Sequence, residues 1–333
     1  MKRFLVTTVL ALSVVLLLQS CSHRSHGPIV PESKLPKVSV KIHRYGKALF
    51  SLDTSHFQEG LKKLKKPFPY FLDADLNDTA NVNQLYRYAT DTQIVHIYHQ
   101  TMKVFPNLNP LERELSSAFS HFKYYFPDYS LPTVFSYVSD LYYEHPILRR
   151  DTVLVIALDD YLGQNYLPYE ELDIPDYHRR CMQKAFIPID VMNAVYDHYF
   201  YPSIPPGDVL DKMIASGKRL YFLDAMMPLT PDSVKIGYTE SQMKWMEKHK
   251  RDVWAVLVKD NLLYSTNYMT MNKLTQPGPF SDGFSHSSPA AMGNWFGWQM
   301  VRKYMSKYPK TTLLQLMSMN DAQSILQKSG YKP

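Results

Sequence analysis

The chain has 333 residues, of which 20% are charged, 45% hydrophobic and 14% aromatic, a globular composition that excludes disordered, collagen-like and low-complexity proteins. Its formal net charge is +6 at pH 7, but no basic motif of a nucleic-acid-binding protein accompanies it, so we expect no nucleic-acid partner. Two cysteines are too few for a disulfide framework.

The first 20 residues have the pattern of a lipoprotein signal peptide. Lys2 and Arg3 precede an uncharged apolar run of about 15 residues, which is shorter than a transmembrane helix requires. The residues LQSC at 18–21 resemble a bacterial lipobox, in which the cysteine is lipidated and becomes the new N-terminus. We therefore expect a lipidated Cys21 that attaches the protein to a membrane; the alternative is an ordinary secretory signal with a chance cysteine.

Residues 21–40 are expected to form a lipid-anchored tether, since three prolines are spaced along them among polar residues. Ser22 follows the cysteine, and by resemblance to known sorting signals a residue other than aspartate there directs a lipoprotein to the outer membrane. The residues HRSH at 23–26 differ from the acidic export tag of surface-exposed lipoproteins. We therefore expect the protein on the periplasmic face.

The rest of the chain, residues 41–333, is expected to form a single domain. Apolar and polar residues alternate over 38–42 and predict a first strand. Residues 83–105 predict a helix that Pro106 ends. The next helix is predicted to start with Asn109 as its cap and to bury an apolar stripe of Leu111, Leu115, Phe119 and Phe122.

Two further strands are predicted over residues 133–138 and 153–158. The second reads VLVIAL, an uninterrupted apolar run that is typical of a buried central strand. Asp159 and Asp160 follow it directly, and an acid–base pair is one interpretation of them. Because adjacent residues of an extended chain point to opposite sides, we interpret them as a polar turn.

Helices dominate after Pro188. The sequence predicts helices that start at Asp190, at Asp208, near Glu240 and at Ser288–Pro289, and a last short one that Gly330 ends. Gly293 and Gly297 lie four residues apart in one of them, where glycine is tolerated if another element packs very close. This strand-poor pattern predicts an α+β fold that is mostly α, with a small sheet.

Familiar catalytic motifs are absent from the sequence. It contains no HExxH, no GxSxG, no Walker loop and no GxGxxG after a strand. His96 and His99 share a helix face without an acidic ligand beside them, and Cys181 has no CxxC partner. We therefore expect no metal, no cofactor and no catalytic residue.

The C-terminal half carries the clearest resemblance. The stretches GKRLYFLDAMMPLTPDSVKIGYT (217–239), KDNLLYST (259–266) and PAAMGNWFGWQMVRKYM (289–305) resemble the gliding-motility lipoprotein GldB family of Bacteroidetes, as does VLVIALDDYLG at 153–163. The resemblance implies an outer-membrane lipoprotein linked to gliding or to the associated cell-envelope machinery. It does not establish a biochemical activity.

A second resemblance is to zinc peptidases with a gluzincin-like layout. In these, one helix carries HExxH and a second helix, roughly E-G-x-x-x-Y, supplies the third zinc ligand. The residues SGKRLY at 216–221 are similar to the second helix, with Ser216 in the place of the glutamate. The helix at 190–200 corresponds to the first, and Asn193, Ala194 and Asp197 then occupy the positions of histidine, glutamate and histidine.

The replacement of the zinc ligands and of the base decides the chemistry that we expect. Zinc hydrolysis needs about three protein ligands and a base for the bound water. Asparagine and serine bind zinc poorly, alanine cannot act as a base, and one aspartate cannot hold the metal alone. We therefore predict a gluzincin-like helical scaffold that has lost its metal and its activity. The alternative is that both helices are core helices without catalytic ancestry.

Such a scaffold can keep its groove for recognition. We expect the groove near the four degenerate positions and include Tyr221 and Trp298 in it, because Tyr and Trp are rigid anchors at interfaces. The leading hypothesis is thus a non-catalytic periplasmic lipoprotein that binds a protein partner in the envelope or gliding machinery. The alternatives are an envelope hydrolase with an unrecognised site and a purely structural component of a motor or secretion complex.

Overall fold

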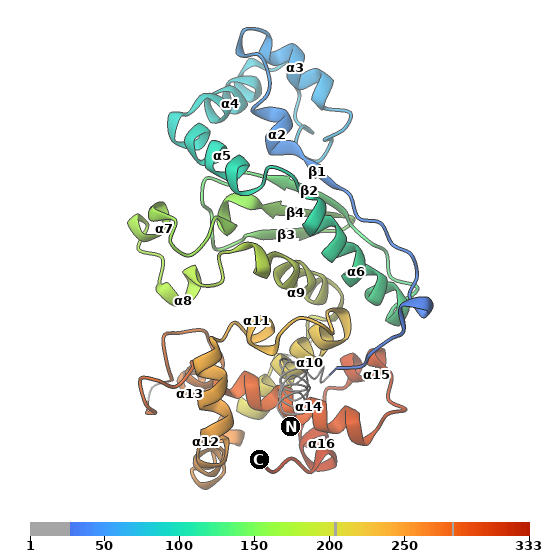
Figure 1. Ribbon diagram of the computed structural model, residues 1–333, viewed down its shortest axis with the longest axis vertical. Coiled ribbons are helices and arrows are strands. Elements are labelled where there is room, and N and C mark those ends of the chain that lie inside the picture. Colours follow the sequence, from blue (N-terminus) through green and yellow to red (C-terminus); the bar gives the residue numbers. More distant parts are fainter. Residues whose placement is uncertain (1–26, 203–204, 282) are drawn as a thin grey trace, which may run out of the picture.

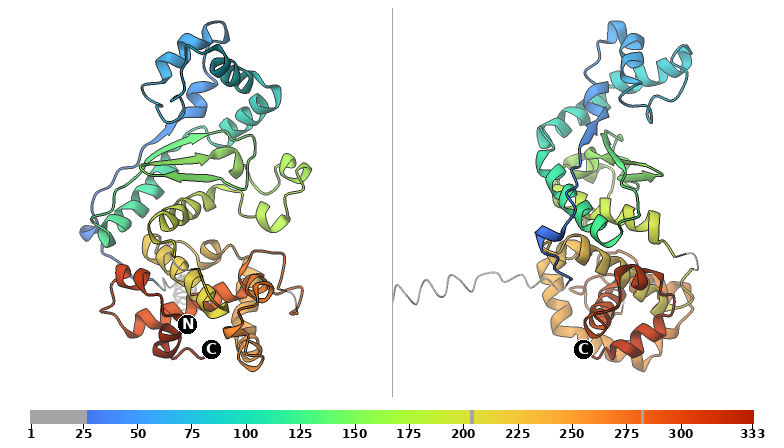
Figure 2. Two further views of the ribbon diagram at one scale, coloured as in Figure 1. Left: turned by 180° about the vertical axis from the view of Figure 1, so that it is seen from behind. Right: turned by 90° about the vertical axis from the view of Figure 1, so that its right-hand side faces the viewer.

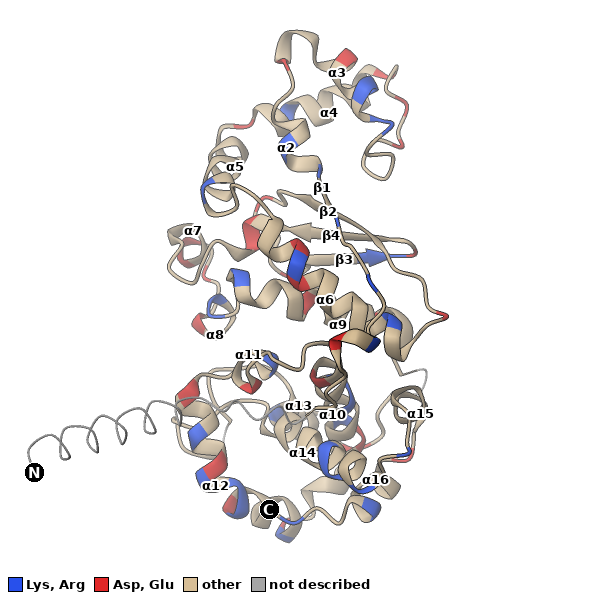
Figure 3. Ribbon diagram, turned by 45° about the vertical axis from the view of Figure 1, so that its right-hand side comes forward, with Lys and Arg blue, Asp and Glu red and all other residues tan. Residues whose placement is uncertain are grey.

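The computed structural model describes residues 27–202, 205–281 and 283–333. The expected signal peptide and the expected lipidation site at Cys21 lie outside these residues. The fold is α+β and mostly α, as the sequence predicted. Figure 1 shows an elongated molecule with a sheet half (residues 42–202) above a helical half (residues 205–333). Lys and Arg are interspersed with Asp and Glu over both halves (Figure 3).

A four-stranded sheet of order β1-β2-β4-β3 forms the centre of the sheet half. Its strands are β1 (Ile42–Arg44), β2 (Thr133–Tyr137), β3 (Ile147–Arg150) and β4 (Val153–Ala157). β1, β2 and β4 are parallel, whereas β3 pairs antiparallel with β4. β4 lies between two strands and is buried from Leu154 onward, which confirms the buried central strand.

One face of the sheet is covered by a small aromatic core. Phe135 and Val155 pack there with Tyr45 and Phe68, and Tyr45 stacks on Phe71 with 4.0 Å between the ring centroids. The covering helices are α2 (Tyr45–Leu49), α3 (Phe57–Leu64) and α4 (Thr79–Thr90). Beside them, α5 (Thr92–Val104) buries Ile94 and Ile97 in a separate cluster with Val138 and Leu141. In Figure 1 these helices form the upper end of the molecule.

The opposite face of the sheet joins the main core. Val134 and Leu154, which alternate with the residues of the aromatic core, pack there with α6 (Asn109–Tyr125) and α9 (Ile187–Phe200). The predicted stripe of α6 is confirmed, since all four of its residues are buried. Two short helices, α7 (Leu167–Glu171) and α8 (Asp176–Arg179), precede α9.

The helical half is built around α10 (Val209–Met226) and α14 (Met292–Lys307). The helices around them are α11 (Asp232–Ile236), α12 (Glu240–Lys259), α13 (Tyr268–Thr275), α15 (Leu313–Ser318) and α16 (Ala322–Ser329). Short 3-10 helices occur at Glu32–Lys34 (η1), Thr54–His56 (η2), Leu158–Tyr161 (η3), Lys184–Phe186 (η4) and Leu262–Tyr264 (η5).

Glycines set the separation between α10 and α14. A Cβ atom on Gly297 would lie 1.8 Å from the carbonyl oxygen of Met213, and one on Gly217 would lie 2.3 Å from the carbonyl of Gly297. A Cβ on Gly293 would lie 2.8 Å from the carbonyl oxygen of Leu274. The close approach predicted from Gly293 and Gly297 is therefore confirmed.

An extended N-terminal strap, residues 27–41, connects the two halves (Figure 2). The N–H groups of Val38 and Val40 donate to the hydroxyls of Ser120 and Ser116 on α6, at 3.3 and 2.9 Å. At the other end a Cβ on Gly27 would lie 2.6 Å from that of Asp224 on α10. Described residues of the expected tether thus lie on the folded body.

Several predicted boundaries are corrected. The helix expected over residues 83–105 is two helices, because Asp91 is extended and accepts the N–H groups of Gln93 and Ile94 as the cap of α5. The strand expected over 38–42 begins only at Ile42, since the preceding residues bond to α6 instead. β3 was not predicted.

Two helix starts also differ from prediction. α9 begins at Ile187, so that Asp190 lies inside its first turn, and Pro188 occupies one of the first positions. α14 begins at Met292 rather than at Ser288–Pro289, because Ala291 has a positive φ of 53° and ends the preceding loop.

Candidate functional site

The degenerate positions predicted from the sequence lie on α9 and α10, which pack against each other. Asn193, Ala194 and Asp197 are spaced so that they share one side of α9. Ser216 is partly buried on α10. We call the surface formed by these four residues and Arg219 the α9–α10 face.

An ion pair joins the two helices of this face. Arg219 on α10 donates through both terminal nitrogens to the carboxylate of Asp197 on α9, one of the bonds measuring 3.2 Å. The guanidinium also lies over the ring of Tyr196, 5.2 Å from its centroid. Partial burial raises the pKa of Asp197, against the lowering influence of Arg219. Asp197 is therefore paired with a cation and is not available as a free base.

The other positions of the α9–α10 face are less tightly connected. The Oδ1 atom of Asn193 is buried and has no hydrogen-bond partner among the described residues. Ala194 carries no polar group. Among the residues that the structure describes, no cluster of three or more His, Cys, Asp and Glu side chains could hold a metal ion.

Tyr221 and Trp298, expected in the groove, lie in the core. Trp298 is fully buried and Tyr221 nearly so. The indole N–H of Trp298 donates to Asp224 at 2.8 Å, and Arg302 lies 3.6 Å over its ring. Because both rings are enclosed by protein, neither lines a groove in this structure.

Those aromatic side chains surround a buried charge cluster that the sequence did not predict. The Asp224 carboxylate accepts bonds from Arg302 at 2.7 and 2.8 Å and from Lys235 at 2.9 Å. Arg302 also reaches Asp232, with bonds of 2.7 and 2.8 Å. Two carboxylates thus face two cations, and such a pairing is what makes a buried charge tolerable.

Asp159 and Asp160 are both buried and lie in η3 rather than in an extended turn. Their side chains therefore converge instead of separating, and the Ser139 hydroxyl lies 3.0 and 3.4 Å from them. Asp159 also accepts the N–H groups of Ser139 and Leu141, at 2.8 and 2.9 Å. Burial, and then the charge of Asp159, raise the pKa of Asp160 to about 8. Both carboxylates are enclosed by protein, and the bonds of Asp159 hold the loop after β2.

A third acid with a perturbed pKa, the half-buried Asp190, lies in the first turn of α9. Its carboxylate accepts a hydrogen bond from the Tyr161 hydroxyl at 2.8 Å. Burial raises the pKa of Asp190 to about 7, although this bond opposes the rise. Perturbed carboxyl groups of this kind gather at functional sites, but structural networks perturb them too. From the sequence, Asp190 is recognisable only as a helix-start residue, so nothing there indicated its bond with Tyr161 or its raised pKa.

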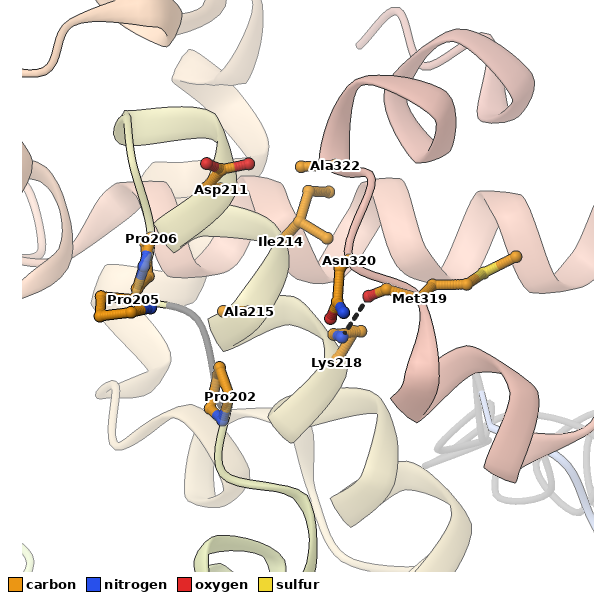
Figure 4. A pocket seen from close by; sticks show the side chains of 10 residues that line it. All are labelled: Pro202, Pro205, Pro206, Asp211, Ile214, Ala215, Lys218, Met319, Asn320 and Ala322. Carbon is orange, nitrogen blue, oxygen red and sulfur yellow. Dashed lines mark hydrogen bonds between the residues drawn. The ribbon is translucent and has the colours of Figure 1, made fainter.

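A small cavity of 110 Å³ lies between α10, the segment before it and the α15–α16 connection (Figure 4). Lys218, next to the predicted Ser216, lines it. The Lys218 ammonium donates to the carbonyls of Met317 and Met319 at 3.1 and 2.7 Å, and burial lowers its pKa to about 8. The cavity is smaller than the ~300 Å³ at which drug-sized ligand pockets begin. Lys218 therefore caps the end of α15.

Comparison with known proteins identifies one family. The model of the family described as "Gliding motility protein GldB" matches residues 28–333. No curated protein and no solved structure matches the chain. The family resemblance is therefore supported, whereas the resemblance to zinc peptidases rests on the sequence alone.

Proposed function

The chain belongs to the GldB family of gliding motility proteins, and from this premise we propose that it is a lipoprotein that binds a protein partner of the gliding or cell-envelope machinery without catalysing a reaction. Lipidated Cys21 would hold it on the periplasmic face of the outer membrane. The lipobox at residues 18–21 supports the anchor. No helix among the described residues is long and apolar enough to cross a membrane.

The observation that carries the non-catalytic assignment is which residues form the α9–α10 face and how they are paired. On a gluzincin-like scaffold this face would present ligands and a base, but here Asp197 is bound by Arg219 and the flanking positions are Asn193, Ala194 and Ser216. The partly exposed Asp197–Arg219 pair and the Ser216 hydroxyl suit hydrogen bonding and ion pairing with another protein. Tyr201, 72% exposed just after α9, adds an aromatic anchor of the type found at interfaces.

Site-specific photo-crosslinking in intact cells tests this proposal. A crosslinking residue at His198, exposed beside Asp197 on α9, is expected to give one dominant adduct. The matched control is the same residue at Glu59, exposed on α3 at the far end of the molecule. Asp197→Arg, which places two cations together, is expected to abolish the His198 adduct while the melting temperature of the protein changes little.

The rival function is an envelope hydrolase. Its test is to incubate the purified full chain with zinc, to measure bound metal by mass spectrometry, and to assay cleavage of unstructured peptides. Stoichiometric tight zinc, or peptide cleavage that Asp197→Ala removes, would overturn the non-catalytic assignment. Equal crosslinking from His198 and Glu59 would overturn the α9–α10 face as the binding surface.

A further inference from the structure

Formal charge is divided unequally along the length of the molecule. The helical half, residues 205–333, carries 16 Lys and Arg against 10 Asp and Glu, a net charge of +6. The sheet half, residues 42–202, carries 15 Lys and Arg against 20 Asp and Glu, a net charge of −5. Figure 1, in which the longest axis is vertical, shows the two halves at opposite ends of this axis. The positive end of this elongated molecule is therefore the helical half.

Four exposed lysines gather where α14 and α16 end, and we call them the lysine end: Lys303, Lys307, Lys328 and Lys332. The Lys303 ammonium donates to the Gly330 carbonyl at 2.8 Å. That of Lys307 donates to the Lys328 carbonyl at 2.9 Å. None of the four lysines takes part in an ion pair with a described residue. Figure 1 shows α16 and the C-terminus at the lower end of the helical half, away from the sheet.

The acidic groups beside the lysine end do not neutralise it. Lys303 and Lys332 line one open hollow of 440 Å³ between α12, α14 and the chain end. Glu247 is the only acidic side chain among the described residues that line this hollow, and it is bonded to Lys250 at 2.7 Å. Pro333 adds the terminal carboxylate, one negative charge against the four lysines. An excess of positive charge therefore remains on this surface.

Two tyrosines lie among the same ammoniums. The Lys303 Nζ atom is 5.8 Å from the ring centroid of Tyr331. The Lys307 Nζ atom is 6.0 Å from that of Tyr308, a residue that is 36% exposed. Tyrosine is enriched at membrane–water interfaces, where its ring lies at the level of the lipid headgroups. The lysine end thus combines the two kinds of side chain that suit such an interface.

The lipid anchor of the proposed function belongs to the same half. Gly27 packs against Asp224 on α10, and Asp224 is bonded to Arg302 on α14. Arg302 lies only five residues, about 7.5 Å of helix, before Lys307. The six residues from Cys21 to Gly27 span at most about 22 Å. A lipid on Cys21 and the lysine end can therefore meet one membrane surface.

We propose that the lysine end lies on anionic phospholipid headgroups of the membrane that holds the lipid, so that the helical half faces the membrane and the sheet half projects away from it. This orientation rests on the lipid anchor of the proposed function. The acyl chains attach the protein in any orientation, whereas the charge distribution selects one, because lysines are attracted to an anionic surface and the negative sheet half is repelled. The α9–α10 face, at the junction of the halves, then stays clear of the membrane.

Lysine labelling of the reconstituted protein tests this orientation. The mature lipoprotein, residues 21–333 with its acyl chains, is placed in nanodiscs of phosphatidylcholine alone or of equal parts phosphatidylcholine and phosphatidylglycerol. Acetylation of each lysine is followed by mass spectrometry. The lysine end is expected to react about fivefold more slowly in the anionic discs, as the attraction of one lysine to such a surface implies. Lys62 and Lys63, exposed on α3 at the opposite end, should react equally in both.

Salt and charge reversal show whether charge causes the protection. Salt at about 1 M, where the Debye length is about 3 Å, is expected to remove it while the acyl chains keep the protein in the disc. The double substitution Lys328→Glu with Lys332→Glu is expected to remove the protection of Lys303 and Lys307. The matched double substitution Lys62→Glu with Lys63→Glu should leave that protection unchanged.

The outcomes separate this orientation from the anchor on which it rests. Protein that stays in neither disc would contradict the lipid anchor, and the orientation with it. Protein that stays in both discs but is labelled equally at the lysine end would overturn the orientation alone. Protection in isolated cell envelopes without protection in anionic discs would assign the lysine end to a protein partner and would also overturn it.

Discussion

Two aspartates, the buried Asp224 and the half-buried Asp190, show how strongly the surroundings of a carboxylate affect its pKa. Asp224 accepts bonds from Arg302, Lys235 and Trp298, so its charge is matched by cations in direct contact. Asp190 receives one hydrogen bond, from a neutral tyrosine. Burial therefore raises its pKa from 3.8 to about 7, and the folded protein binds its proton more tightly than the unfolded chain does.

This difference predicts a pH dependence of stability. Because the pKa of Asp190 is higher in the folded state, protonation of this carboxyl stabilises the folded protein. This contribution is complete below about pH 4 and is lost as the pH rises to about 7. Asp190→Asn keeps an acceptor for Tyr161 but has no charge to bury. It is expected to be more stable than the wild type at pH 8, by at most about 1.4 kcal/mol for each pKa unit of the shift, and equally stable at pH 4.

Urea denaturation at pH 4, 6 and 8 measures the effect. The matched control is Asp252→Asn, because the Asp252 side chain is 84% exposed and should leave the pH profile unchanged. Parallel profiles of Asp190→Asn and the wild type would show that Asp190 does not titrate as its burial implies.

At the scale of elements, α10 and α14 pack closely enough for their backbones to meet. Three glycines permit it, and at two of them the added Cβ would meet backbone atoms of the partner helix rather than a flexible side chain. Backbone cannot rotate away as a side chain can. The two helices would have to move apart to accept a methyl group at either position, and the core around Trp298 would open with them.

Gly297→Ala is accordingly expected to lower the free energy of unfolding by about 3 kcal/mol or more, at the upper end of overpacking effects. The control is Gly207→Ala, where the added Cβ would lie 3.3 Å from the Asp211 carboxylate and meet no other described atom within 4 Å. Thermal and urea unfolding of both variants checks the comparison. A Gly297→Ala protein as stable as Gly207→Ala would contradict the close packing.

Elements with a strong local signal could be predicted from the sequence. The cap at Asp208, the stripe of α6 and the apolar run of β4 all appear where expected, because each depends on neighbouring residues. β3 could not be predicted, since its sequence ILRR lacks an apolar face and its pairing with β4 makes it a strand. The break at Asp91 was missed because the apolar period continues across it.

The candidate sites depend on contacts between distant residues, so less of them could be predicted. The sequence drew attention to Asp197 and Ser216 but did not show that Arg219 binds Asp197. The buried charge cluster joins Asp224 to Arg302, 78 positions further along the chain, and no local pattern reports such a meeting. Trp298 was expected at a groove because the sequence alone does not distinguish an aromatic residue of a core from one at an interface.

At the scale of the whole molecule, the strap connects the helical half to the edge of the sheet. Serines four residues apart on α6 each donate to a carbonyl of their own helix and accept an N–H of the strap. Ile42 continues the pattern, its N–H donating to Glu112 at 3.0 Å. The N–H group of every second residue from Val38 to Ile42 is therefore bonded to α6. This explains why apolar and polar residues alternate over 38–41 although these residues form no strand.

Hydrogen exchange of the backbone amides tests this pattern. Val38 and Val40 are expected to exchange about fivefold more slowly than Ser39 and Lys41, as a net hydrogen-bond contribution near 1 kcal/mol implies. Ser116→Ala should remove the protection of Val40 selectively. Ser117→Ala, an exposed neighbour, should not, and uniform exchange over 38–41 would show that the strap is not held as described.

The strap also sets a path for mechanical load. Cys21 is six residues before Gly27, so a lipid there would sit within about 22 Å of Asp224 at full extension. Tension on that lipid would first lift Gly27 away from Asp224 and then break the bonds of Val38, Val40 and Ile42 one after another. Ile42 is the first residue of β1, so the load reaches the first strand of the sheet only with the last of these bonds. A protein that serves motile machinery would thus yield by unpeeling one short segment while both cores stay intact.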